Sequence, residues 1–205
     1  MTVIVVANPK GGVGKSTLST QVAGYLARRG HTVLLGDSDR QQSASRWLAL
    51  RPKQARPIVT WDASHSDNLK PPPGTTHVVL DTPAGLHGRD LKEVLKRADK
   101  LLIPLQPSVF DILATQDFVA ELQERRRSVG LPIGVVGMRV DARTLSAEKL
   151  RAFVQGLELP VLTYLRDTQN YINLAGQGLT LFDVAPGRVQ RDLEQWLPIC
   201  RWLEQ

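Results

Sequence analysis

The chain has 205 residues, a length that suits one compact domain, so we expect residues 1–205 to form a single unit. Hydrophobic residues make up 42% of the sequence and charged residues 22%, which excludes disordered and collagen-like classes. There is no run of eighteen apolar residues, and the single cysteine, Cys200, can form neither an internal disulfide nor a zinc or iron–sulfur site alone. The first residues lack the basic start and cleavage site of an export signal. These features predict a cytoplasmic protein.

The charge balance is basic. There are 26 Lys and Arg residues against 20 Asp and Glu residues, which gives a net charge of +6. An excess of this kind favours an acidic polymer as a partner. Residues 1–119 carry 15 basic and 10 acidic side chains, whereas residues 120–205 carry 11 and 10. A nucleic-acid surface therefore has to be a local patch and not a basic tail.

Short apolar runs alternate with helical patterns along the chain. Strands are predicted at 3–7, 31–36, 58–61, 77–81, 100–105, 133–140 and 159–165, and helices at 16–29, 46–50, 88–98, 111–128, 169–175 and 186–203. We expect Pro198 to interrupt the last helix. Nearly continuous apolar strands that alternate with helices indicate an α/β fold, with a mostly parallel central β-sheet flanked by helices on both faces.

A glycine-rich segment, NPKGGVGKST at residues 8–17, directly follows the first strand and begins the first helix. This is the context of a phosphate-binding loop, in which glycines let amide N–H groups point at phosphate oxygens. We expect Lys15 to meet the β- and γ-phosphates and Ser16 to ligate Mg²⁺. The predicted nucleotide contacts in this segment are Lys10, Gly11, Gly12, Val13, Gly14, Lys15, Ser16 and Thr17.

The segment departs from the general phosphate-loop string, because position 9 is Pro and a second lysine stands at position 10. The form KGGVGKST resembles the deviant Walker A box of the ParA/MinD group of P-loop ATPases. The resemblance implies ATP and Mg²⁺ as cofactors and an ATP-dependent homodimer that sandwiches the nucleotides. It also implies that Lys10 is catalytic by reaching the phosphates of the partner copy, whereas Lys15 is expected to be catalytic at the phosphates bound by its own loop. The alternative for Lys10 is a solvated loop lysine.

Carboxylates end two of the predicted strands, where a Mg²⁺-nucleotide site needs oxygen ligands. Asp81 closes VVLD, a Walker B pattern, and we expect it to hold Mg²⁺ through water. Asp37 and Asp39 lie in GDSDRQQ, which resembles the DxDPQ box of the same family with Arg40 in place of Pro. The resemblance implies that Asp37 lies near the metal and that Asp39 helps to orient the attacking water. As an alternative or additional role, Asp39 is the N-cap of the helix at 46–50.

The resemblance to this family extends over nearly the whole chain. Further matching segments are DTPAG at 81–85, IPLQPSVFDI at 103–112, VDARTLS at 140–146 and YLRDTQNYINLAGQGLTLFD at 164–183. It implies that Met138 and Arg139 flank the adenine. Because Met138 stands where a family side chain often hydrogen-bonds the base, we expect the backbone to recognise the adenine.

The chain begins at its first strand, and so it looks like the short ParA type, which partitions plasmids or positions protein cargo. The resemblance implies a nucleoid-associated protein that binds DNA without sequence preference when it holds ATP. It also implies slow hydrolysis that a ParB-like or cargo adaptor protein stimulates. Two alternatives stay open, a membrane-associated regulator of MinD type and a small-molecule P-loop enzyme such as a ligase or kinase. The apolar residues of the last helix are expected to pack in the core, which predicts no stable membrane association.

Candidate DNA contacts are arginines in the last third of the chain. Arg166 matches a family arginine, and Arg188 and Arg191 lie on the predicted last helix. Residues 40–61 also stand out, because they contain five basic residues and no acidic one, namely Arg40, Arg46, Arg51, Lys53 and Arg56. The alternative for each arginine is a solvated helix face, and residues 125–127 can simply complement a helix C-terminus.

Overall fold

A computed structural model describes residues 1–62, 71–108, 115, 118–123, 130–156 and 159–205. Within these residues the chain forms a seven-stranded sheet in the order β3-β2-β4-β1-β5-β6-β7, and every neighbouring pair is parallel. The strands are β1 (Thr2–Val6), β2 (Val33–Asp37), β3 (Val59–Asp62), β4 (His77–Asp81), β5 (Lys100–Leu105), β6 (Ile133–Gly137) and β7 (Val161–Tyr164). The predicted α/β fold is confirmed.

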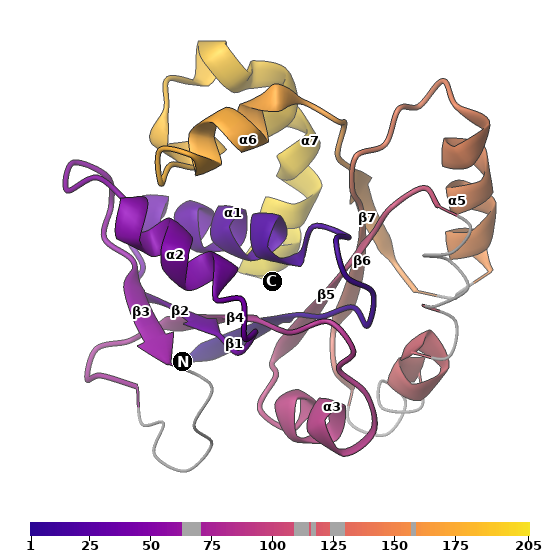
Figure 1. Ribbon diagram of the computed structural model, residues 1–205, viewed down its shortest axis with the longest axis horizontal. Coiled ribbons are helices and arrows are strands. Elements are labelled where there is room, and N and C mark those ends of the chain that lie inside the picture. The colour runs from indigo at the N-terminus through magenta and orange to yellow at the C-terminus, as the bar shows by residue number, and fades with distance from the viewer. Residues whose placement is uncertain (63–70, 109–114, 116–117, 124–129, 157–158) are drawn as a thin grey trace.

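Helices cover both faces of the sheet (Figure 1). They are α1 (Lys15–Arg28), α2 (Ser43–Leu50), α3 (Gly88–Leu95), α5 (Leu145–Gln155), α6 (Gln169–Ala175) and α7 (Pro186–Glu204), with a short 3-10 helix, η1 (Leu181–Asp183). α1, α2, α6 and α7 pack on one face, and α3 and α5 pack on the other. The helix predicted at 111–128 lies largely outside the described residues, although Phe118, Val119 and Leu122 are buried in the core of the second face.

The central strands are apolar on both faces because both faces are covered. In β1, Ile4 and Val6 belong to the core beneath α1, and Val5 belongs to the core on the side of α3. Successive side chains of a strand point to opposite faces, so one uninterrupted apolar run fills both cores. This arrangement leaves polar side chains for the ends of the strands, where the loops begin.

The sheet order brings the ends of three strands to one edge. β1 lies between β4 and β5, and in the register of the sheet Asp81 is opposite both Val6 and Asp37. The chain leaves β1 toward α1 at this edge, next to the point where the strand order reverses. Ligands of open parallel sheets bind in the crevice outside the carboxyl ends of the strands at such a point.

Several predicted bounds differ from the structure by a few residues, and two of the differences affect the site and the last helix. β6 ends at Gly137 and not at residue 140, because Arg139 adopts a positive φ of 52° that turns the chain out of the sheet. α7 continues through Pro198, and its non-helical residue is Val189, with φ −134° and ψ 20°. The turns around Pro198 are held by burial of Trp196, Ile199 and Leu203. Packing here outweighs the hydrogen bond that proline removes.

The end of α7 is fastened to the sheet by a lysine. The Nζ atom of Lys100, at the start of β5, donates hydrogen bonds to the carbonyls of Trp202 (2.9 Å) and Leu203 (2.7 Å). These bonds satisfy carbonyl groups that a helix C-terminus otherwise leaves unpaired. The predicted core packing of the last helix is therefore confirmed, and Leu197 is its exposed large apolar side chain. None of the helices in the described ranges has the length and apolar character that a membrane crossing requires.

Two histidines lie side by side with tilted rings at the opposite ends of the strands, and they give a prediction about pH. The rings of His31 and His77 lie 4.1 Å apart between centroids. Burial, and then the charges of His31, the amino terminus and Lys100, lower the pKa of His77 from 6.5 to about 4. Folding therefore favours neutral His77, and its contribution to stability is present above pH 6.5 and lost as the pH falls toward 4.

We expect His77→Gln to flatten this part of the stability profile. Between pH 7 and pH 5 the wild type should lose about 1 kcal/mol more unfolding free energy than the variant, since part of the effect is screened at a half-buried position. Urea unfolding at both pH values measures the difference, and Gln190→Ala, an exposed change on α7, serves as control. Parallel pH profiles of wild type and His77→Gln contradict this account.

Candidate nucleotide site

The loop between β1 and α1 has the backbone shape of a phosphate cradle. Gly12 and Gly14 have φ values of 78° and 98°, in the left-handed region that other residues rarely adopt. Gly14 is also the N-cap of α1, so the helix begins with unpaired N–H groups directed at the loop. The N-terminus of a helix adds a partial positive charge at this point. The loop is therefore built to receive an anion.

Lys15 is buried within this loop. Its Nζ atom donates a hydrogen bond to the carbonyl of Lys10 (2.8 Å), which folds the side chain back over the glycines. Burial lowers the pKa of Lys15, while the carboxylates of Asp81 and Asp39 raise it. A lysine held among these groups supplies a positive charge where the loop faces phosphate. The Lys10 side chain, in contrast, is exposed.

Asp81 ends β4 with a carboxylate that the protein satisfies only in part. Its Oδ1 atom accepts a hydrogen bond from the Ser19 hydroxyl (3.1 Å), whereas Oδ2 is buried without a hydrogen-bond partner. Burial raises the pKa of Asp81 to about 7, against the lowering influence of the nearby Ser16 and Ser19 hydroxyls. An ionised carboxylate in this position needs a cation, so the donor set fits Mg²⁺.

The described residues contain no group of three or more His, Cys, Asp or Glu side chains that could hold a metal by themselves. Mg²⁺ commonly takes one or two protein oxygens and completes its octahedron with phosphate and water. Asp81 and the hydroxyl of Ser16 are the side chains that would hold it here, and their role as metal ligands stays a prediction. Bound Mg²⁺ would neutralise charge on the phosphate oxygens.

Asp37 organises the start of α2. Its Oδ2 atom accepts hydrogen bonds from the N–H groups of Ala44 (2.8 Å) and Ser45 (3.1 Å), and its Oδ1 atom accepts one from Asp39 (3.0 Å). The alternative prediction that Asp39 caps this helix is therefore wrong, because Asp37 satisfies the free N–H groups. Asp39 instead accepts a hydrogen bond from the N–H of Gln41 (2.9 Å) and stays half-exposed beside the loop.

A cavity of about 260 Å³ adjoins the phosphate loop on the side of β6 and β7. Gly14 and Thr17 line it from the loop and α1, and Met138 and Arg139 line it from the segment after β6. A Cβ atom on Gly14 would lie 3.0 Å from the Met138 methyl group, so the glycine permits close packing here. The structure thus brings the two predicted base-flanking residues next to the phosphate loop.

Two buried or half-buried amides tie the loop to its surroundings, and the sequence prediction missed both as site residues. Asn8 is fully buried; its Oδ1 atom accepts from the N–H of Lys10 (2.8 Å) and its Nδ2 atom donates to the Pro104 carbonyl (2.8 Å). Gln106 donates from Nε2 to the Gly12 carbonyl (2.8 Å) and lines the cavity. The sequence signal for Asn8 was an amide residue directly after an apolar strand, because an amide that is buried there needs hydrogen-bond partners.

The segment after β4 also contacts the loop. The N–H of Gly85 donates to the Pro9 carbonyl (2.7 Å), and the Thr82 hydroxyl donates to the Val6 carbonyl (2.8 Å). Residues 81–85, the DTPAG segment, are therefore bonded both to the end of β1 and to the beginning of the loop. A movement of the phosphate loop would therefore be transmitted to this segment through these hydrogen bonds.

The three predicted DNA-contact arginines meet at one surface hollow. Arg166, Arg188 and Arg191 all line a space of about 520 Å³ at the beginning of α7. The Arg166 guanidinium is paired with the fully buried Asp192, at 2.5 Å from Nε to Oδ1 and 3.2 Å from Nη2 to Oδ2. Asp192 offsets its charge, whereas Arg188 and Arg191 are exposed. The hollow therefore offers two exposed cations and one that is paired.

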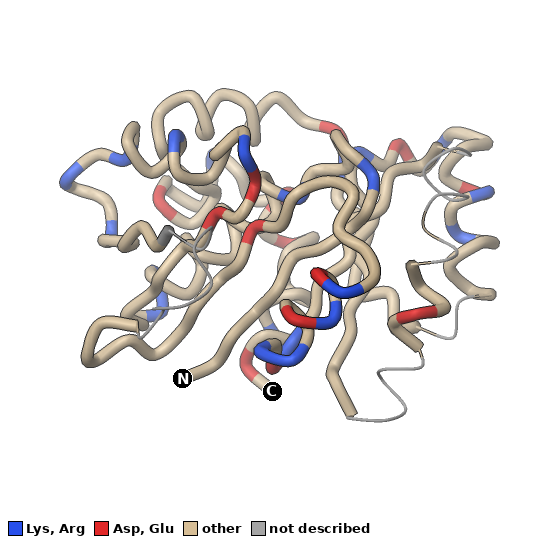
Figure 2. The backbone as a smooth tube through the Cα atoms, turned by 60° about the horizontal axis from the view of Figure 1, so that its bottom comes forward, with Lys and Arg blue, Asp and Glu red and all other residues tan. Residues whose placement is uncertain are grey.

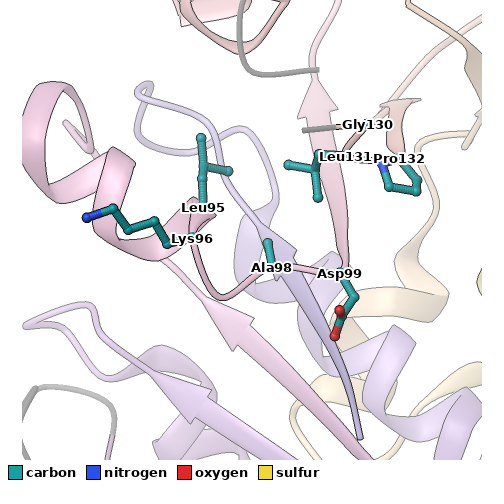
Figure 3. Close-up of a pocket in the computed structure, with 7 residues that line it drawn as sticks. All are labelled: Leu95, Lys96, Ala98, Asp99, Gly130, Leu131 and Pro132. Atoms are coloured by element: carbon teal, nitrogen blue, oxygen red, sulfur yellow. The ribbon is translucent and has the colours of Figure 1, made fainter. Parts of the chain in front are cut away.

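Another cavity lies at the opposite end of the strands (Figure 3). It is lined by Leu95, Ala98 and Asp99 from the end of α3 and the segment that precedes β5, and by Gly130 and Leu131 from the segment that precedes β6. The Lys96 side chain points away from it in the close-up. Since phosphate loops and carboxylates gather at the carboxyl ends of the strands, this cavity is separate from the candidate site.

Comparison with known proteins identifies the family. The CobQ/CobB/MinD/ParA nucleotide binding domain matches residues 4–181. The chain belongs to this family. The maintenance of carboxysome distribution protein A of Halothiobacillus neapolitanus is 30% identical over 199 residues, which cover 92% of this chain and 91% of that protein. The chromosome-partitioning ATPase Soj of Thermus thermophilus is 29% identical over 184 residues, which cover 73% of this chain and 74% of Soj.

Solved structures agree on the fold. A Cyanothece McdA–ATP complex has a TM-score of 0.72 at 18% identity and covers 97% of this chain and 96% of its own. The resemblance to the ParA/MinD group that was inferred from KGGVGKST is thus confirmed, and the protein is a ParA/MinD-family ATPase.

The position of Asn8 gives a testable prediction for this ParA/MinD-family protein. Asn8→Ala leaves the Lys10 N–H and the Pro104 carbonyl without their buried partner, at a cost of about 1–3 kcal/mol. We expect nucleotide affinity to fall about tenfold, because the loop loses its fixed starting point. Equilibrium binding of a fluorescent ATP analogue measures the effect, with exposed Asn173→Ala as the control. Unchanged affinity at an unchanged melting temperature contradicts the positioning role.

Proposed function

We propose that this ParA/MinD-family protein dimerises on binding ATP and Mg²⁺, binds DNA without sequence preference and hydrolyses ATP slowly. The observation that carries the proposal is a phosphate loop with two differently placed lysines next to a buried, incompletely satisfied aspartate. Lys15 is held inside the loop, Lys10 is exposed on its outer side, and Asp81 faces the loop from β4. Such a site can bind a Mg²⁺-nucleotide and still leave one lysine for a neighbouring molecule.

The residues of one copy account for binding and positioning. The loop N–H groups and Lys15 hold the terminal phosphates, and Ser16 and Asp81 hold the metal directly or through water. Asp39 is half-exposed beside the loop, where it can orient a water molecule. The described residues that line the cavity beside the loop include no His or Glu that could act as a strong general base, so hydrolysis is proposed to depend on positioning and charge. Slow turnover follows from this arrangement.

Lys10 is proposed to complete the site of a second copy. Its backbone is fixed, because its N–H donates to Asn8 and its carbonyl accepts from Lys15, but its side chain is exposed. A positive group that enters a phosphoryl-transfer site from another molecule is worth about 10³ to 10⁵ in rate. ATP binding and dimerisation would then be coupled, since each copy supplies a charge that the other needs.

The proposed biological role is to position a protein cargo or to segregate DNA from a place on the nucleoid in the cytoplasm. The names of two relatives support this role, one being a carboxysome distribution protein and the other a chromosome-partitioning ATPase. An adaptor protein of ParB type or one attached to cargo is the proposed activator. Stable membrane association is not part of the proposal, because the large apolar side chains Trp196, Ile199 and Leu203 of α7 are buried.

The decisive experiment is sedimentation with nonspecific duplex DNA. Wild type and Lys15→Ala are compared with ADP, with ATP and with a slowly hydrolysed ATP analogue. We expect wild type to sediment with DNA only when a triphosphate is present, and Lys15→Ala to remain in the supernatant throughout. Parallel arms with anionic liposomes test the membrane alternative. Binding to liposomes without binding to DNA, or ATP turnover with no response to either surface, overturns the proposal.

A second prediction concerns Lys10. Because its proposed role is exerted on the partner copy, Lys10→Ala should bind a fluorescent ATP analogue with affinity within about threefold of wild type but lower steady-state ATP turnover by at least about tenfold. Lys149→Ala removes an exposed lysine from α5 and is the matched control. Turnover of Lys10→Ala at the wild-type rate contradicts the role in trans.

A further inference from the structure

A surface formed by α2 and the segments on either side of it carries four exposed basic side chains. Arg40, Arg46, Lys53 and Arg56 are all exposed, and residues 40–61 contain no Asp or Glu. We call these four residues the α2 basic surface. Figure 2 shows Lys and Arg positions along the loop that follows α2, at the far left of the view. The surface is distinct from the arginine hollow at the beginning of α7.

Arg51 is the remaining basic residue of residues 40–61, and it fixes the segment after α2 to the rest of the domain. Arg51 forms an ion pair with Asp183 at 2.9 Å, and both side chains are nearly buried, with 6% and 4% exposed. Its Nη1 atom donates to the Gly178 carbonyl (3.0 Å), and its Nε atom donates to the Arg56 carbonyl (2.9 Å). Arg51 is therefore structural, and it holds the backbone of Arg56 in place.

The four residues of the α2 basic surface have no ion-pair partner in the part of the chain that the structure describes. Other exposed cations do, including Arg29 with Glu204, Lys96 with Glu93 and Arg143 with Asp141. Arg46 projects from α2 on the side opposite to the buried Ala44 and Trp47. Unpaired cations on a fixed backbone form a site for a polyanion, because they need not give up an internal partner to bind.

The same helix is bonded to the nucleotide site at its other end. Asp37 accepts the N–H groups of Ala44 and Ser45, at the beginning of α2. The next residue, Ser38, donates from its N–H to the Asp81 carbonyl (3.0 Å) and from its hydroxyl to the same oxygen (3.0 Å). A shift of the loop around Asp37 and Asp81 on binding nucleotide therefore moves the start of α2 and with it the placement of Arg46.

We propose that the α2 basic surface contacts the phosphate backbone of duplex DNA, and that the nucleotide state sets its position through Asp37. This inference rests on the proposed DNA binding and adds a second contact surface to it. A lipid surface fits less well, because Ala44 and Trp47 of α2 face the core. Leu50 is the exposed large apolar side chain of this helix, and one such side chain does not form the apolar face that inserts between lipids. Phosphate contacts of this kind carry no sequence information, in keeping with nonspecific binding.

The test compares two variants with the same loss of charge. Arg46→Gln/Lys53→Gln/Arg56→Gln removes three cations of the α2 basic surface, and Arg89→Gln/Lys92→Gln/Arg97→Gln removes three exposed cations on or beside α3, on the other face of the sheet. Binding to a 40-base-pair duplex is measured with the slowly hydrolysed ATP analogue over a range of salt. Each lost phosphate contact lowers the slope of log affinity against log salt by about 0.9.

We expect the α2 variant to have a slope shallower than wild type by about 2 to 3, and the α3 variant to match wild type. Both should keep wild-type melting temperatures and nucleotide affinity. A wild-type slope for the α2 variant, or an equal loss in the α3 variant, overturns the inference while leaving the proposed function intact. If wild type itself fails to bind the duplex, the proposed function fails. If wild type binds anionic vesicles but not DNA, and the α2 variant no longer binds the vesicles, the surface is assigned to membrane binding instead.

Discussion

The parallel register of β1, β2 and β4 is the constraint on which the site depends. It ends all three strands at one edge, so that Asp37 and Asp81 are opposite each other and the phosphate loop leaves β1 beside them. Parallel strands require crossover connections, and α1, α2 and α3 begin at this edge, after β1, β2 and β4. The N–H groups of those helix starts and the carboxylates at the strand ends therefore face a common space. An anionic ligand with a divalent cation satisfies both kinds of group at once.

The loop and its supports form a chain of hydrogen bonds that runs away from this edge in several directions. Asn8 accepts a hydrogen bond from the N–H of Lys10, and the carbonyl of Lys10 accepts one from the side chain of Lys15. The N–H of Gly85 donates to the carbonyl of Pro9. Asp81 is the member that the protein leaves unsatisfied at Oδ2. A buried carboxylate in this condition is costly for the protein alone. The cost is removed when a cation binds, and this links binding of the metal to the geometry of the surrounding bonds.

α2 joins the nucleotide edge to the outer surface of the protein. Asp37 accepts hydrogen bonds from N–H groups at the beginning of the helix. Just after its end, Arg51 forms an ion pair with Asp183 and donates a hydrogen bond to the Gly178 carbonyl. A nearly buried ion pair of this kind is poor evidence of net stability, because desolvation offsets the attraction, but it fixes geometry. The helix is thus held between the nucleotide site and the segment that leads to α7. Arg46 on its outer face, Arg40 before it and Lys53 and Arg56 after it are exposed cations without an ion-pair partner among the described residues.

The sequence by itself determined the fold class, the phosphate loop and the strand-end carboxylates, because these follow from local patterns. Apolar runs, glycine spacing and residues such as Lys15 and Asp81 are read within a few positions of each other. Only the tertiary structure decided which charged side chains already have an ion-pair partner within the protein. Arg51 and Arg166 look like the other arginines in sequence, yet their partners Asp183 and Asp192 lie 132 and 26 residues away. It also decided that Asp37 and not Asp39 accepts the free N–H groups at the start of α2, and that α7 continues past Pro198, because burial and long-range hydrogen bonds outweigh local preference there.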